Sequence, residues 1–355
     1  MTCTNPLYRL PIEHTNSSDD IFLRGRRPIN GGYIFGRDDY INIFERFGAE
    51  WFQQIPCGQC QACRRKKQLE WSIRCSKEAE LYEHNYFITL TYNDFHLPVE
   101  ECLNLYTGEY DVTPTLRIRD FQLFMKRLRQ GVIEEFGSTS SPRVFYSGEY
   151  GDLNGRSHFH AILFNMPDLY SDFILRRACD SYRIYNSPFI DKMWSKKETG
   201  SIGLTSISEC NFNTIAYTAK YAMKRYHGSN TKASKVSGLP VKVNPFCNMS
   251  RRPGIARDWY EAHKDEIYEN DKLPYWKDMQ VHWSKPPRYF DKLYDVDNPD
   301  DMSMIRFDRE QLRVGKFRVE DLTAEQLFAQ QDEAAARLQR SIKRRKESSE
   351  LDLSC

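Results

Sequence analysis

The segment Gly155-Arg-Ser-His-Phe-His-Ala-Ile-Leu-Phe164 is the stretch from which the fold can be predicted. It ends in the apolar, partly alternating Ala161-Ile-Leu-Phe164 and follows the turn-like Asp152-Leu-Asn-Gly155, a pattern that predicts a strand after a tight turn. Because side chains alternate across a strand, His158 and His160 leave on the same face. Two imidazoles on one face can bind one metal ion. The alternative is that both rings only pack, or bond a backbone carbonyl.

The strand before this segment is predicted to pair with it. Arg143-Val-Phe-Tyr-Ser-Gly-Glu-Tyr150 is joined to the histidine strand by a short turn rich in Gly, Asp and Asn, which predicts an antiparallel hairpin. Pairing brings Glu149, near the end of its strand, close to the start of the next. Glu149 is therefore the candidate third metal ligand, and a charged residue beside a turn is the alternative.

Two further strands and a helix follow from residue patterns. The β-branched and aromatic run 86–92 and the segment 203–208 predict strands. A helix begins near Asp120, where Phe121 and later apolar residues recur at helical spacing. Residues 167–200 are interpreted as an inserted helical segment. Together these elements predict an α+β fold.

The overall composition is that of a folded protein with local rather than global charge. The chain has 355 residues, 28% of them charged, and a formal net charge of only +2. Affinity for nucleic acid would therefore have to come from local basic patches. The N-terminus has no basic start followed by an apolar run, and no apolar stretch approaches the ~20 residues that span a bilayer. We expect a cytoplasmic protein without a membrane segment.

Three cysteines lie close together in Cys57-Gly-Gln-Cys60-Gln-Ala-Cys63. This spacing is typical of metal ligands, but a structural zinc takes four ligands and only three are local. Cys75 lies further along the helix predicted from about residue 62 to 84. The sequence leaves two interpretations open, a zinc site and reduced cysteines that pack a turn.

A third helix, predicted over residues 211–226, carries two tyrosines four residues apart. This spacing puts Tyr217 and Tyr221 on one face, with Cβ atoms ~5–6 Å apart, next to Lys220 and one turn before Lys224. A tyrosine stripe can simply be core. The alternative is chemical: a tyrosine attacks phosphorus best as phenolate, which nearby positive charge from Lys220 would favour.

The metal site would serve the same chemistry. A cation bound by two histidines and one carboxylate keeps open positions for a phosphate and water, which suits Mg²⁺ or Mn²⁺. It would polarise the phosphate and stabilise the charge that develops during attack. Basic residues near these elements are expected to contact the DNA backbone. They are Arg156, Lys126, Arg127, Lys224 and Arg225.

Three motifs occur in an order that resembles the HUH endonucleases of rolling-circle replication: Ile88-Thr-Leu-Thr91, the histidine segment 155–164 and Tyr217-Thr-Ala-Lys-Tyr221. Flanking strings are similar to those of the replication initiation proteins of gokushovirus-type microviruses, which are small single-stranded DNA phages. These strings are Pro56-Cys-Gly-Gln-Cys60, Gln122-Leu-Phe-Met-Lys-Arg-Leu128, Met249-Ser-Arg-Arg-Pro-Gly254 and Lys285-Pro-Pro-Arg-Tyr289.

The resemblance implies an antiparallel sheet of about five strands with flanking helices, and a divalent ion on the motif histidines. It also implies strand transfer by the motif tyrosines at a single-stranded viral origin, in the cytoplasm of an infected bacterium. No Gly-x-x-x-x-Gly-Lys-Ser/Thr loop is present, so host helicase and polymerase would be partners.

We accordingly divide the chain into an irregular N-terminal arm (1–56), a nicking and joining domain (57–290) with the helical insertion, and a C-terminal helical extension (291–355). Two alternatives remain open from the sequence. One is a non-catalytic protein that binds the origin, and the other is a related HUH transposase or relaxase.

Overall fold

The computed structural model describes residues 3, 6–11, 15, 32–36, 53–103, 109–138, 141–151, 154–179, 182–221, 243–314, 326, 328–329, 331–337 and 339–340. The chain forms two compact units. The central unit comprises Gln68–Asp297, and the terminal unit comprises Met1–Lys67 together with Asn298–Cys355. The division proposed from the sequence, into residues 1–56, 57–290 and 291–355, stays a prediction.

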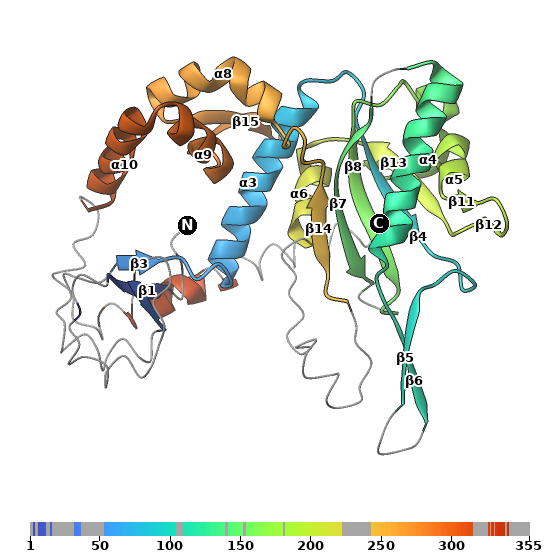
Figure 1. Ribbon diagram of the computed structural model, residues 1–355, viewed down its shortest axis with the longest axis horizontal. Helices are drawn as coiled ribbons and strands as arrows, with labels where there is room; N and C mark the ends of the chain where they lie inside the picture. Colours follow the sequence, from blue (N-terminus) through green and yellow to red (C-terminus); the bar gives the residue numbers. More distant parts are fainter. Residues whose placement is uncertain are drawn as a thin grey trace. The chain divides into compact units, whose positions relative to one another are not determined.

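A seven-stranded antiparallel sheet forms the core of the central unit, in the order β14-β7-β8-β4-β13-β10-β9. Figure 1 labels β14, β7, β8, β4 and β13 of this sheet. Its strands are β4 (Tyr86–Thr91), β7 (Arg143–Tyr150), β8 (Ser157–Phe164), β9 (Ile174–Cys179), β10 (Tyr182–Asn186), β13 (Thr205–Glu209) and β14 (Phe246–Met249). Helices accompany the sheet, so the predicted α+β class is confirmed. The hairpin of β7 and β8 and the strand β4 are also confirmed as predicted.

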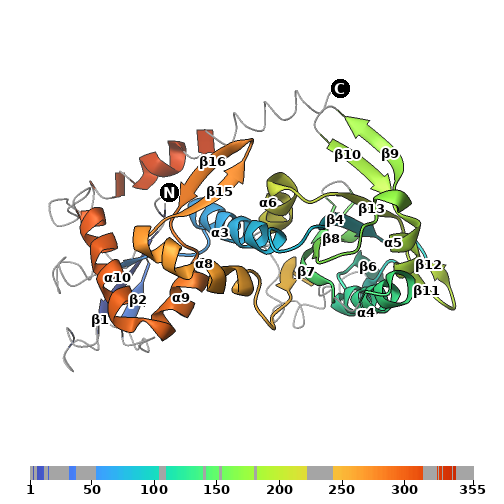
Figure 2. The same cartoon turned by 90° about the horizontal axis from the view of Figure 1, so that it is seen from above.

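Helices cover both faces of this sheet, as Figure 2 shows with α6 and α4 on opposite sides. The first face packs against α4 (Ile118–Phe136), where the Phe121 ring stacks 3.8 Å from that of Tyr146. The second face contacts α6 (Phe212–Tyr221) and α3 (Gln61–Ala79). The main hydrophobic core lies on the α4 side, so the second face is the one left for polar groups.

Helix α4 illustrates why the sequence pattern works. Its residues Phe121, Phe124, Met125 and Leu128 are buried, as the helical spacing predicts. The helix ends at Gly137, which adopts a left-handed conformation with φ 64° and donates its N–H to the carbonyl of Ile133. The apolar stripe and the terminal glycine together set the length of the helix.

The segment 167–200 differs from the prediction, because it is mainly strand rather than helix. It contributes β9 and β10, which extend the sheet beyond β13 and raise the strand number from about five to seven. Its helical content is the short α5 (Pro188–Met193) and a 3-10 turn, Tyr170–Asp172. The physical reason is that Ile174–Cys179 and Tyr182–Asn186 are too short for stable helices and gain backbone partners by joining the sheet edge.

The rest of the central unit consists of short hairpins and helices around the sheet. They are β5 (Val99–Leu103), β6 (Tyr110–Pro114), β11 (Ser195–Lys196), β12 (Gly200–Ser201), α8 (Arg257–Asn270), β15 (Leu273–Lys277), β16 (Gln280–Ser284) and α9 (Arg288–Asp297). Strand β15 lies against α6, where the Phe212 and Tyr275 rings stack 5.3 Å apart.

The terminal unit contains a three-stranded antiparallel sheet in the order β2-β1-β3. Its elements are β1 (Leu7–Pro11), β2 (Gly32–Phe35), β3 (Gln53–Ile55) and α10 (Pro299–Val314), and the described residues from 326 to 340 are helical. The Gln331 side chain donates to the Tyr8 hydroxyl at 3.2 Å, which ties the late helical residues to β1. Across the described part of the chain, no helix is long and apolar enough to cross a membrane.

Candidate metal site and nucleophile

The register of the hairpin brings the three predicted metal ligands onto one face of the sheet. Glu149 on β7 lies directly opposite His158 on β8, and His160 lies directly opposite Thr89 on β4. Residues directly opposite one another in an antiparallel pair share a face, and residues two apart in one strand do too. All four side chains therefore leave on the face covered by α6.

The ligand atoms converge on a single point. One carboxylate oxygen of Glu149, Oε1, lies 3.2 Å from Nε2 of His158 and 2.8 Å from Nε2 of His160. Glu149 is 2% exposed and His160 is 6% exposed, whereas His158 is partly open to solvent. The cluster is thus closed on the protein side and open near His158, as a site that must admit a substrate requires.

Hydrogen bonds on the far side of each ring fix how the histidines present their Nε2 atoms. Nδ1 of His158 lies 3.2 Å from the carbonyl of Arg156, and Nδ1 of His160 lies 2.9 Å from Oγ1 of Thr89. A carbonyl can only accept, so Nδ1 of neutral His158 carries the proton and Nε2 keeps its lone pair. Ligating histidines commonly donate from their second nitrogen in this way.

The close approach of the Glu149 carboxylate to the two Nε2 atoms is the arrangement expected of a metal site. Both Nε2 of neutral His158 and the ionised carboxylate of Glu149 are acceptors, so their close approach is favourable only when a proton or a cation lies between them. The donor set is two imidazoles and one carboxylate, which suits a divalent transition ion such as Mn²⁺ and is also compatible with hydrated Mg²⁺. The residues fit a divalent cation.

The pKa directions agree with metal binding near neutral pH. Burial alone would raise the pKa of Glu149, but its interactions with His158 and His160, in which a proton lies between ring nitrogen and carboxylate, outweigh burial, so the pKa lies below its ordinary value. A metal ion would take the place of that proton. Burial lowers the pKa of His160, although Glu149 opposes this shift. The carboxylate is therefore ionised and the His160 ring neutral, which are the protonation states that bind metals.

Helix α6 presents Tyr217 to this site. The Tyr217 ring centroid lies 5.0 Å from that of His160, edge to face, and the side chain is 40% exposed. The helix starts where Oδ1 of Asn211 accepts from the N–H groups of Asn213 and Thr214, both at 3.0 Å. On the other side of the helix, Ile215, Thr218 and Ala219 are buried. Asn211 capping and the buried apolar side thus fix the rotation of α6.

The structure describes the side chain of only one of the other two predicted catalytic residues, Lys220 and Tyr221. Lys220 is exposed on α6, one turn beyond Ala216. Tyr221 is the last helical residue of α6, but its side chain lies outside the described residues. The sequence-based pairing of two tyrosines on one face therefore stays a prediction.

Of the predicted DNA contacts, Arg156 lies nearest the histidines. Its guanidinium bonds the Tyr92 carbonyl at 3.0 Å and Asp94 at 2.5 Å. Lys126 and Arg127 lie on α4, which covers the opposite face, and Nε of Arg127 donates to a carbonyl of α5 at 2.7 Å. Lys224 and Arg225 lie outside the described residues. The structure thus brings only Arg156 next to the metal ligands.

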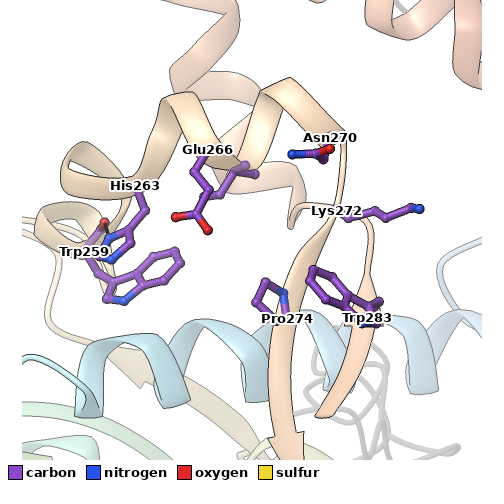
Figure 3. Close-up of a pocket in the computed structure, with 8 residues that line it drawn as sticks. Trp259, His263, Glu266, Asn270, Lys272, Pro274 and Trp283 are labelled. Carbon is purple, nitrogen blue, oxygen red and sulfur yellow. Dashed lines mark hydrogen bonds between the residues drawn. The ribbon is translucent and has the colours of Figure 1, made fainter.

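A cavity of about 650 Å³ opens beside His158. It is lined by Thr91, Tyr92, Gly151, Asn154, Arg156, Ser157, His158 and Leu204. A cavity of about 710 Å³ elsewhere in the central unit is lined by residues such as Trp259, His263 and Trp283 (Figure 3). It is the larger of the two, but its residues contribute to neither of the potential metal-ligand groups among the described residues. The cavity beside His158 is therefore the candidate substrate site.

Two functional positions were missed by sequence reasoning. Thr89 orients His160, and its only signal was its place in the strand motif 88–91. Cys3 joins Cys57, Cys60 and Cys63, so the cluster has four thiols rather than three. No local spacing could reveal Cys3, since it lies 54 residues from Cys57.

Comparison with known proteins agrees with the motifs. A family model for replication-associated proteins of the ORF2 type matches residues 85–226. Replication-associated protein ORF2 of Spiroplasma virus 4 is 29% identical over 266 residues, which cover 74% of each chain. Replication-associated protein VP4 of Bdellovibrio phage phiMH2K is 28% identical over 281 residues, covering 77% of this chain and 78% of the relative.

A third relative, replication-associated protein ORF4 of Chlamydia phage 1, is 27% identical over 211 residues, 57% of this chain and 47% of its own. No solved structure gives a significant match. The matched family segment 85–226 contains Glu149, both site histidines and Tyr217. The chain is therefore similar to the replication-associated proteins of these three viruses.

Proposed function

We propose that the protein initiates rolling-circle replication of a small single-stranded DNA phage genome by cutting and rejoining DNA at a specific site. The observation that carries this proposal is the position of Tyr217, whose ring lies 5.0 Å from His160 on the face that holds Glu149 and His158. A phenol beside a divalent-cation site is the arrangement needed for tyrosine attack on a phosphodiester. The relatives' description as replication-associated proteins supports the same role.

The reaction is a transesterification that conserves the phosphoester bond. The Tyr217 phenol loses its proton and its oxygen attacks phosphorus. The bond from phosphorus to the 3′ oxygen breaks, and that oxygen leaves as a free 3′ hydroxyl after gaining a proton. The protein is then linked to the 5′ phosphate of the cut strand. Because a phosphoester is retained, attack by a 3′ hydroxyl in the reverse direction rejoins DNA.

Each neighbouring residue has a defined part in this proposal. Glu149, His158 and His160 would hold Mg²⁺ or Mn²⁺, which would polarise the phosphate and offset the negative charge that develops on it. Lys220 supplies positive charge that favours the phenolate. Arg156 borders the cavity beside His158 and contributes a positive wall to it, so single-stranded DNA is proposed to enter there.

Other components would complete replication. The sequence has no phosphate-binding loop of the Gly-x-x-x-x-Gly-Lys-Ser/Thr type, so we propose that a host helicase separates the strands and a host polymerase extends the 3′ hydroxyl. We propose that the reaction takes place in the cytoplasm of the infected bacterium. Tyr221 is the proposed second nucleophile, which would release the first strand as a circle.

A covalent capture assay tests the proposal. The full chain is mixed with Mn²⁺ and labelled single-stranded oligonucleotides that tile the phage's own intergenic region, and the products are resolved under denaturing conditions. We expect one oligonucleotide to give a protein–DNA band and a shorter strand with a free 3′ hydroxyl. Binding without cleavage would instead support a non-catalytic origin-binding protein.

Tyrosine variants then identify the nucleophile. Tyr217→Phe should abolish the first covalent adduct, and Tyr221→Phe should retain it but lose strand release. The control is Tyr185→Phe on β10, which removes a hydroxyl from a half-buried ring stacked on Phe173 and should cut normally. Cleavage that survives loss of both Tyr217 and Tyr221 hydroxyls would contradict the nucleophile assignment.

A further inference from the structure

We propose that Cys3, Cys57, Cys60 and Cys63 form a structural zinc site in the terminal unit. Their Sγ atoms all lie within 4.8 Å of one another. This set is distinct from the histidine site, because it lies in the other compact unit and contains only thiols. Four sulfurs fill the tetrahedral coordination of Zn²⁺ and leave no position for a substrate, which is typical of structural rather than catalytic zinc.

The spacing of the sulfurs matches a metal better than a disulfide. Sγ of Cys3 lies 3.6 Å from Sγ of Cys57 and 3.6 Å from Sγ of Cys60. A disulfide needs about 2.05 Å between sulfurs. Four sulfurs at about 2.3 Å from one zinc lie about 3.8 Å from each other in a regular tetrahedron. These four cysteines form no disulfide, and their separation leaves room for one ion.

The loop Cys57-Gly-Gln-Cys60 is already folded as a thiolate-binding turn. The N–H groups of Gln59 and Cys60 both point at Sγ of Cys57, at 3.4 and 3.2 Å. Gly58 has φ +71°, a conformation that L residues with side chains rarely adopt, and it lets the chain turn back on Cys57. Hydrogen bonds from backbone N–H groups stabilise a negatively charged sulfur. Ordinary packing of neutral thiols does not call for two such donors.

The pairing of β1 with β3 brings the fourth ligand, Cys3, close to the other three cysteines. Strands β1 and β3 pair antiparallel with Leu7 opposite Ile55. The chain before Leu7 and the chain after Ile55 therefore emerge at the same end of the sheet. Cys3 precedes one end and Cys57 follows the other, and the N–H of Cys57 also points at Sγ of Cys3 at 3.4 Å. The register of β1 against β3 is therefore consistent with Cys3 lying beside Cys57.

The local charge is also suited to a metal thiolate. Zn²⁺ with four thiolates carries a net charge of −2, after the four thiols have lost their protons. Cys60 directly precedes α3, and Cys63 lies in its first turn. Burial raises the pKa of the Cys63 thiol, so its thiolate needs a cation beside it. The following residues 64–67 are Arg-Arg-Lys-Lys, whose four positive charges offset the remaining negative charge. The consequence is that zinc would fix residues near the N-terminus to the start of α3.

Metal analysis of the purified full chain tests this proposal. Because the histidine site can also take up zinc, the background is the His158→Ala, His160→Ala variant. It should retain one zinc per chain, as measured by mass spectrometry of the metal. In that background Cys3→Ser should reduce the zinc to near zero, whereas Cys3→His should keep it, since imidazole is also a zinc ligand. The matched control is Cys247→Ser on β14, which should leave zinc unchanged.

A second measurement does not depend on any variant folding. The wild-type chain, stripped of metal and loaded with Co²⁺, should show the intense visible absorption of tetrahedral cobalt bound to thiolates, and added Zn²⁺ should displace it. A chain that contains no zinc and gives no such spectrum would overturn the proposal. So would zinc that is unaffected by Cys3→Ser in the histidine-free background.

Discussion

Thr89 offers a way to weaken the metal site without touching a ligand. Its Oγ1 lies 2.9 Å from Nδ1 of His160, and both side chains leave on the same face of the sheet. Thr89→Val preserves the shape and the strand preference of the side chain but removes this hydrogen bond. His160 would then lose a contact that fixes its ring orientation. The expected result is weaker metal binding with an intact fold.

The size of the effect follows from burial. Loss of a partner that orients a metal-ligating histidine typically costs about 10- to 100-fold in metal affinity or activity, or about 1.4 to 2.8 kcal/mol. His160 is only 6% exposed, so bulk water does not easily replace the lost bond. We therefore expect the upper part of this range.

The assay is DNA cleavage measured against Mn²⁺ concentration, together with direct titration of Mn²⁺. Thr89→Val should shift the half-maximal concentration upward, and saturating Mn²⁺ should restore most of the rate. The matched control is Thr205→Val on the neighbouring strand β13, whose Oγ1 donates to Oδ1 of Asp191 at 2.6 Å instead of bonding a metal ligand. An unchanged Mn²⁺ response in Thr89→Val, or an equal shift in the control, would refute this reasoning.

Four other outcomes are expected. Glu149→Gln should weaken Mn²⁺ binding at least about tenfold in titration, because an amide lacks the negative charge of the buried carboxylate. Acidification should release Mn²⁺. Burial lowers the pKa of His160, so the ring is neutral at pH 7 and competes for a proton only at lower pH; Mn²⁺ affinity that does not fall on acidification would contradict this. Gly203→Ala should lower the melting temperature, because its Cβ would overlap the Thr91 carbonyl; an unchanged melting curve would count against that packing. Phe121→Ala should reduce the free energy of unfolding by about 3 to 5 kcal/mol in denaturant titration, because it empties a buried ring position, and a cost below about 1 kcal/mol would contradict the predicted core.

The sequence was sufficient where local rules decide the structure. Alternation along 157–164 and a short turn before it placed His158, His160 and Glu149 together, because both rules operate within a few residues. Helix α6 was found from its spacing and its start near Asn211. These features depend on the backbone period and on turn chemistry, which a single sequence displays directly.

Prediction failed where distant segments supply the partners. Residues 174–186 form strands because the edge of β13 is available to β10, and nothing within the segment itself reveals that edge. Cys3 reaches the other cysteines through the pairing of β1 with β3, across 54 residues of chain. The hydrogen bond between Thr89 and His160 likewise depends on the register of β4 against β8.

The register of β7 against β8 determines whether Glu149 and His158 lie on the same face of the sheet. A slip of one residue between the strands would turn Glu149 to the opposite side of the sheet from His158, into the aromatic layer around Phe121, whereas a slip of two would restore the side but lengthen the separation. Single-residue insertions within either strand should therefore inactivate the site even where the fold survives. Length changes between Tyr150 and Ser157 should be tolerated only if Glu149 still pairs with His158.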